Sequence, residues 1–138
     1  MDNRKMKNIN DILPRKAINI RKGEGSFIFI DLEPEKGSKI SLWVYMCDWT
    51  LTKEKLIVTS ENIDETFDLA GIILGDMISI SKNEESGKIQ INFSTGVKLA
   101  LSNEEGFYSG DDDYFMLFVG DDWVAKYSEQ NGFSVKRQ

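Results

Sequence analysis

Histidine is absent from the 138 residues, and cysteine occurs once, as Cys47. Without histidine the chain cannot form a Ser-His-Asp or Cys-His catalytic centre, and it lacks both the commonest general base and the imidazole metal ligand. A single cysteine excludes an internal disulfide and is typical of a reducing compartment. Because Cys47 lies in an apolar stretch with no base beside it, we expect a buried, inert thiol.

Long hydrophobic runs are also missing. No apolar segment approaches the roughly 20 residues that a membrane-spanning helix needs, and no apolar region follows the basic N-terminus, so we expect no signal peptide. Apolar residues make up 41% and charged residues 29% of the chain. Length and composition predict one globular, cytoplasmic domain over residues 1–138. We expect residues 1–16 to form an arm or a short helical turn.

The net charge of −6 is unevenly distributed. Residues 1–23 carry seven Lys and Arg against two Asp and Glu, a balance of +5, whereas the remaining 115 residues have a balance of −11. An acidic body repels nucleic acid and anionic membranes and attracts basic partners. We therefore expect a binding protein whose partner is basic, with no nucleic-acid or membrane partner.

Strand-like segments recur about every ten residues and end at Gly-rich or polar turns. The first begins at Ala17, and the others span 26–33, 39–49, 55–60, 76–82, 88–93, 97–102, 114–119, 123–127 and 133–135. Residues 50–54 are predicted as a hairpin loop, and a short helix is expected to begin near Asn62. This pattern predicts a mainly β protein: an antiparallel β-sandwich or a strongly bent, barrel-like sheet with at most one or two short helices.

Acidic pairs and triplets could do chemistry in two ways. Two carboxylates can perform glycoside hydrolysis, but adjacent aspartates on a turn point apart, so a catalytic pair would have to come from different loops. Carboxylate oxygens also bind calcium, although DDDYF lacks the spacing and distal Glu of an EF-hand loop. The remaining interpretation is solvated turn residues. The groups are Glu84/Glu85, Glu104/Glu105, Asp111/Asp112/Asp113 and Asp121/Asp122.

The C-terminal third combines acids with aromatic residues. Residues 102–129 hold eight acids and one base, together with seven aromatic side chains. Carboxylates that steer a basic protein and aromatic rings that anchor it are typical of a binding surface. We predict Asp111, Asp112, Asp113, Asp121 and Asp122 as steering groups, with Tyr108 and Trp123 as anchors. The two aspartate groups flank the strand 114–119, so they should lie about 20–25 Å apart.

Residues 69–101 contain a strand, the sequence Phe93-Ser94-Thr95-Gly96, and an alternating strand through Val97, Leu99 and Leu101. This arrangement resembles the small β-rich immunity proteins of polymorphic-toxin and contact-dependent growth inhibition systems. The resemblance implies a small, cytosolic, non-catalytic and often acidic protein that binds the toxic C-terminal domain of a partner, often a nuclease, and blocks its active site.

Three functions follow from these observations. The first is an immunity or inhibitor protein, monomeric or weakly dimeric, with no catalytic residues, metal or cofactor. The second is a β-sandwich carbohydrate-binding module, with or without calcium, for which Trp43, Trp49 and Trp123 are the candidate stacking residues. The third is a small enzyme that uses carboxylates alone.

Overall fold

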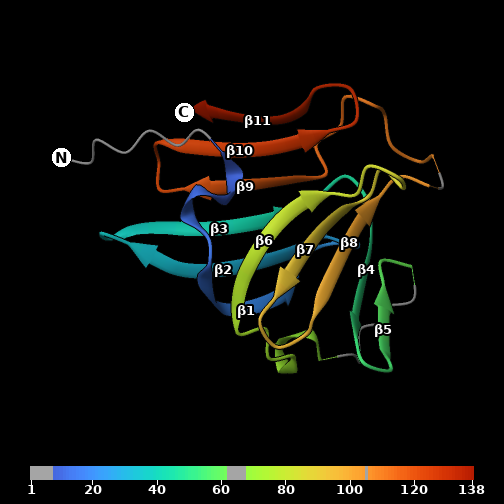
Figure 1. The fold of residues 1–138 in the computed structure, drawn as a ribbon, viewed down its shortest axis with the longest axis horizontal. Coiled ribbons are helices and arrows are strands. Elements are labelled where there is room, and N and C mark those ends of the chain that lie inside the picture. Colours follow the sequence, from blue (N-terminus) through green and yellow to red (C-terminus); the bar gives the residue numbers. More distant parts are fainter. Residues whose placement is uncertain (1–7, 62–67, 105) are drawn as a thin grey trace.

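The computed structural model describes residues 8–61, 68–104 and 106–138 (Figure 1). Eleven antiparallel strands form one sheet that does not close, in the order β11-β10-β9-β3-β2-β1-β6-β7-β8-β4-β5. The strands are β1 (Arg15–Lys22), β2 (Ile28–Glu35), β3 (Ser38–Val44), β4 (Asp48–Lys53), β5 (Leu56–Thr59), β6 (Asp76–Lys82), β7 (Ile89–Phe93), β8 (Lys98–Ser102), β9 (Phe115–Val119), β10 (Trp123–Ser128) and β11 (Gly132–Arg137).

Helical structure in the described ranges is limited to two 3-10 turns, η1 (Ile9–Ile12) and η2 (Leu69–Gly71). The prediction of a mainly β, antiparallel protein with at most one or two short helices is therefore confirmed. The helix expected to begin near Asn62 falls on residues 62–67, outside the described part of the chain.

The segment 39–49 contains parts of two strands, not one. For this reason the sheet has one strand more than the ten strand-like segments predicted from the sequence. β3 ends at Val44 and β4 begins at Asp48, in a different part of the sheet. Between them, the amides of Tyr45 and Met46 donate to the carbonyls of Tyr114 and Asp113, at 2.9 and 3.1 Å. No glycine or proline marks this corner, so its apolar sequence reads as one continuous strand.

The loop predicted at residues 50–54 is also shorter than expected. Thr50, Leu51 and Thr52 belong to β4 and pair with Thr59, Val58 and Ile57 of β5. A tight turn at residues 54–55 joins the two strands, with Glu54 at a positive φ of 53°. The threonines look loop-like in sequence because they occupy the outer positions of a strand whose inner positions are Trp49 and Leu51.

The strand order shows that β4 to β8 are one continuous insertion. Strands β1, β2, β3, β9, β10 and β11 are neighbours in that order, so they form a meander interrupted only between β3 and β9. The interrupted ends are themselves paired, Val44 opposite Phe115. The inserted strands join the meander through two residue pairs, Arg15 with Met77 and Lys16 with Asp76.

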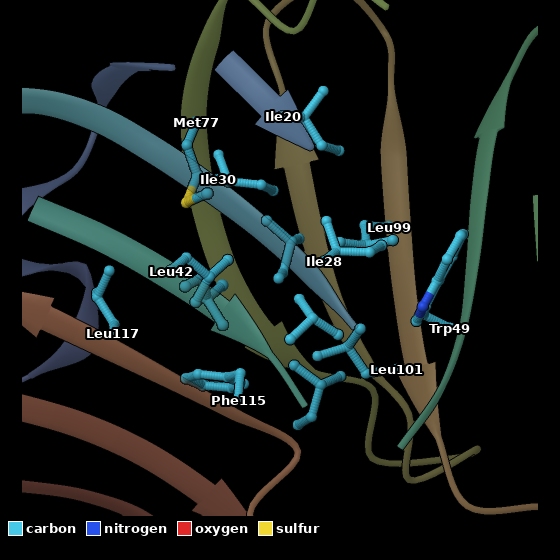
Figure 2. Packing of buried hydrophobic residues seen from close by; sticks show 14 of the residues in the cluster. Ile20, Ile28, Ile30, Leu42, Trp49, Met77, Leu99, Leu101, Phe115 and Leu117 are labelled. Carbon is cyan, nitrogen blue, oxygen red and sulfur yellow. The ribbon is translucent and has the colours of Figure 1, made fainter. Parts of the chain in front are cut away.

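One core lies between the two halves of the bent sheet. In Figure 1, β6, β7 and β8 cross in front of β1, β2 and β3. Figure 2 shows Ile28 and Leu42 from the meander facing Leu99 and Leu101 from the insertion, and all four side chains are fully buried. Ile9 and Ile12 of η1 are also buried. This part of residues 1–16 is therefore packed on the sheet and does not extend as an arm.

Candidate functional site: an aromatic groove

The outer surface of the meander carries an unusual row of aromatic side chains. On β2 the buried residues alternate with outward-facing ones, so Phe29 points away from the core while Ile28 and Ile30 point into it. The ring of Phe29 contacts Trp43 of β3 edge-on at 5.3 Å between centroids, and Trp43 contacts Phe118 of β9 at 5.0 Å. Three adjacent strands therefore contribute to one continuous aromatic surface.

The inserted half of the sheet has a different outer surface. Its outward positions on β6, β7 and β8 include Ser79, Asn92 and Ala100, and Asn92 donates to the Ser79 hydroxyl at 3.1 Å. Polar side chains that bond one another are ordinary for a solvated sheet face. This half also exposes single aliphatic side chains, such as Ile57 on β5 and Ile78 on β6, whereas the rings on the opposite half form one continuous surface that requires a functional explanation.

A depression of about 520 Å³ lies over this aromatic row. We call it the aromatic groove. Its walls include Trp43, which is 37% exposed, and Phe118. The residues lining it are Arg21, Asp31, Gly37, Ser38, Lys39, Ser41, Trp43, Phe118, Gly120, Asp121 and Gln138. The size and the mixture of rings with a few charged groups are typical of a binding site.

Asp31 lines the groove and carries a buried, unpaired carboxylate oxygen. It lies on β2 between Asn19 of β1 and Ser41 of β3 in the sheet register. Its Oδ1 atom is buried and finds no hydrogen-bond partner among the described residues. A buried polar atom left unpaired carries a desolvation cost of about 1–3 kcal/mol. The groove therefore contains an acceptor that a ligand could satisfy.

One of the two cationic side chains that line the groove, Arg21, is already engaged by an aromatic ring. The guanidinium carbon of Arg21 lies 4.8 Å from the centre of the Phe29 ring, a cation–π contact. Lys39 is exposed and lines the groove from β3. Arg21 thus lies over the Phe29 ring and Lys39 is exposed. Neither side chain bonds the buried Oδ1 atom of Asp31.

The predicted steering aspartates fall into two separate groups at opposite ends of β9. Asp121 and Asp122 are exposed in the turn between β9 and β10, and Asp121 lines the aromatic groove. At the other end, Asp111 is exposed, while Asp112 and Asp113 are partly buried. The structure therefore brings one of the two groups to the aromatic row and leaves the other at a distance.

The group Asp111–Asp113 is largely used to hold its own loop. Asp111 accepts from the Ser109 hydroxyl at 2.5 Å, and Asp112 accepts from the Ser109 amide at 2.8 Å. Asp113 lies 3.8 Å from the Lys126 ammonium group. These contacts are those of a capped turn and a weak surface ion pair.

Tyr108 is partly buried and belongs to the same loop. Asn103 binds its backbone from both sides, accepting from the Tyr108 amide at 3.2 Å and donating to its carbonyl at 2.9 Å. Its phenol is hydrogen-bonded to the side chain of Ser26, and burial followed by the nearby Asp48 charge raises its pKa. The aromatic side chain that this loop exposes is Phe107, at 74%.

The three tryptophans have three different environments. Trp49 is 1% exposed and donates its indole N–H to the Ser26 carbonyl at 2.5 Å, so it offers no ring face to a ligand. Trp123 packs partly buried against the core, with the Arg137 guanidinium 6.0 Å from its ring centre. Trp43 is the tryptophan that lines the groove. Of the proposed stacking residues, Trp43 has the required exposure.

Cys47 is fully buried, as expected, and its thiol donates to the Tyr114 carbonyl at 3.5 Å. Burial, and then the charge of Asp48, raise the pKa of this thiol. A protonated, enclosed thiol is a poor nucleophile. The prediction of a buried cysteine is confirmed.

Sequence reasoning missed most of the groove because its residues come from four strands, of which β9 lies far along the chain from β1, β2 and β3. Phe29 and Phe118 lie in runs that are apolar on both faces, which is the pattern expected of a strand covered on both sides. One signal was available: Asp31 is a charge within the apolar run of residues 26–33. A charged side chain in such a position is costly unless a partner or ligand meets it.

Comparisons with family models, with curated proteins and with solved structures return no match for this chain. Within residues 8–61, 68–104 and 106–138, no three Asp, Glu or Cys side chains are grouped as metal ligands would be. The helical turns in the described ranges are too short to cross a membrane.

Proposed function

We propose that this chain is a non-catalytic immunity or inhibitor protein that binds a basic toxin domain and occludes its active site. The observation that carries the proposal is the position of Asp121, which lines the same depression as Trp43 and Phe118. A carboxylate at the edge of a set of partly exposed rings can steer a basic partner and then anchor it. We place the protein in the cytoplasm, as a monomer or weak dimer.

This proposal revises the binding surface without changing the type of partner. Trp43 and Phe118 replace Tyr108 and Trp123 as the anchors, because the first two line the groove together with Asp121 and the latter two are not among its lining residues. Asp121 and Asp122 remain the steering pair. The two halves of the sheet, packed as in a β-sandwich, would serve as the rigid support for this surface.

The test requires a candidate toxin domain, which is sought in the reading frame next to this gene. Co-expression with the wild-type protein should protect the cell, and stopped-flow association should slow as salt is added. The D121K/D122K variant should associate at least about tenfold more slowly, because it replaces attraction by repulsion. The matched control is E84K/E85K, which reverses two exposed charges in the turn between β6 and β7. Equal association rates for both variants would overturn this site, and absence of protection by the wild-type protein would overturn the function.

A carbohydrate-binding module is the second candidate, and the exposure of Trp43 beside the unpaired Asp31 oxygen favours it. A sugar could stack on the ring and donate a hydroxyl to the carboxylate. The rings of the row stand at 65° and 81° to one another, however, so they do not form a flat platform. Binding of neutral oligosaccharides, with or without a calcium-dependent rise in melting temperature, would identify this function.

A further inference from the structure

We propose that the aromatic groove is the receptor for one arginine side chain of the partner, whose guanidinium bonds the buried oxygen of Asp31 and stacks on Trp43 or Phe118. This inference rests on the proposed function for the partner being a protein. It specifies which chemical group the partner inserts into the groove, namely the guanidinium of an arginine.

The first step of the argument is what Asp31 requires. An ionised carboxylate accepts hydrogen bonds and cannot donate them. Its Oδ1 atom is buried without a partner among the described residues, and Asp31 lines a depression open to solvent, so the missing group is a hydrogen-bond donor. A donor that also carries positive charge forms a bond about twice as strong as a neutral one. A cation therefore fits this position best.

The second step is the shape of the cavity. Rings line the groove beside the carboxylate, and the Trp43 and Phe118 centroids lie 5.0 Å apart. A guanidinium is planar, stacks on aromatic faces and presents several donors in one plane, whereas an ammonium is a compact and strongly hydrated charge. The combination of a carboxylate with adjacent rings therefore favours arginine over lysine. The contact of Arg21 with Phe29 on the same surface shows the same pairing within the chain.

The third step is the role of the charges at the edge. Asp121 is exposed on one side of the groove, so it can attract the arginine before it enters. Arg21 and Lys39 also line the groove and oppose the attraction of Asp31 and Asp121, so the groove has no excess negative charge to accommodate several cations at once. The arrangement therefore admits one basic side chain and disfavours a broad polybasic segment.

The experiment measures binding of the capped tripeptide acetyl-Gly-Arg-Gly-amide to the full chain by NMR, using the backbone amides of Ser41 and Phe118. We expect saturable shifts. The citrulline tripeptide, which has nearly the same shape without the charge, should bind at least about tenfold more weakly. The lysine tripeptide should be intermediate.

Two variants locate the site. D31N should weaken arginine binding at least about tenfold, while D76N, a change of the same kind at an exposed position on β6, should not alter it. The D31N melting temperature reports whether the fold is intact, and it should stay close to that of the wild type because asparagine has nearly the same shape as aspartate. W43L, at a partly exposed position, tests the ring independently and should weaken binding several-fold.

Other outcomes would overturn the inference. These are equal binding of the citrulline peptide, unchanged binding by D31N, or shifts produced by maltotriose or inorganic phosphate but not by arginine. The two proposals fail separately. If the toxin domain is neutralised equally by wild type and D31N, the arginine site is wrong and the inhibitor function stands. If arginine binds through Asp31 but no toxin domain is neutralised, the function is wrong and the site stands.

Discussion

The side chain of Asn10 pairs with the backbone of Ile80 in both directions. Its Oδ1 atom accepts from the Ile80 amide at 2.9 Å, and its Nδ2 atom donates to the Ile80 carbonyl at 3.0 Å. The backbone pairing between β1 and β6 involves only Met77 and Asp76 on the β6 side, so Asn10 extends the bonding of β6 beyond it. The Asn10 side chain thus pairs with the Ile80 backbone in the way that a residue of a neighbouring strand would.

Replacing Asn10 with alanine should therefore destabilise the protein by about 1–3 kcal/mol, because two partly buried backbone groups of Ile80 lose their partner. Urea unfolding of the purified variant measures this change. N131A, at an exposed turn position, is the matched control and should stay within about 0.5 kcal/mol of the wild type. Equal stability of the two variants would show that water replaces Asn10 without cost.

The W49F variant should lower the free energy of unfolding by about 2–4 kcal/mol. The change leaves a space where the buried indole was, and it removes the donor to the Ser26 carbonyl. W43F is the comparison, because Trp43 is partly exposed on the groove and makes no such bond among those described. Chemical denaturation should separate the two variants clearly. A similar loss of stability for both would contradict the difference in burial on which the groove assignment depends.

Alkaline pH should destabilise the fold through Tyr114. Burial, followed by the hydrogen bond that its phenol donates to Glu129 at 3.0 Å, raises its pKa above the ordinary value of 10.0. The folded state therefore keeps this proton where the unfolded chain releases it. The stabilisation is fully present below about pH 10 and is lost as pH rises toward the folded-state pKa.

The measurement is the free energy of unfolding at about pH 9 and about pH 11, in wild type and in the Y114F variant. Y114F should be less stable at the lower pH, because Glu129 loses a partner, and its stability should fall less between the two values. Part of the slope should remain, since the pKa of Tyr108 is also raised. An identical pH dependence in both proteins would exclude Tyr114 as its source.

Cys47 should be almost inert toward Ellman's reagent in the native protein. Its thiol is buried and its pKa is raised, so thiolate forms only when the chain opens. With an unfolded fraction of about 10⁻³ or less, the reaction should be slowed about 1000-fold or more relative to the protein in denaturant. Rapid labelling of the folded protein would mean that the corner between β3 and β4 opens locally.

The strands were predictable because alternation and turn residues are local signals. Residues 76–82 form β6 with the predicted bounds, but a register shift between Met77 and Ser79 breaks the alternation, so Met77 and Ile80 are both buried and Ile78 is exposed. The corner at residues 45–47 was not predictable, because no local turn signal marks it. Its backbone conformation depends on long-range hydrogen bonds to Asp113 and Tyr114. Secondary structure thus followed local patterns, while the breaks between halves of the sheet depended on distant partners.

The candidate site was predictable only in part, for a related reason. The aspartates stand out in sequence because charge runs are visible without a structure, and Asp121 does line the groove. Phe118 lies in the segment 114–119, which is apolar on both faces, so nothing local distinguishes an outward ring from a buried one there. Its contact with Trp43 depends on the pairing of β3 with β9, which no short-range pattern encodes.

The insertion of β4 to β8 between two paired strands has a consequence for folding kinetics. The Cys47 thiol and the Tyr114 carbonyl that it meets are 67 positions apart, so pairing β3 with β9 closes a loop that contains β4 to β8. Closing so long a loop is entropically unfavourable, and non-local pairing of this kind makes folding slow. The aromatic groove spans the pairing of β3 with β9. Binding competence should therefore appear late in refolding, after most of the β-sheet signal has already returned.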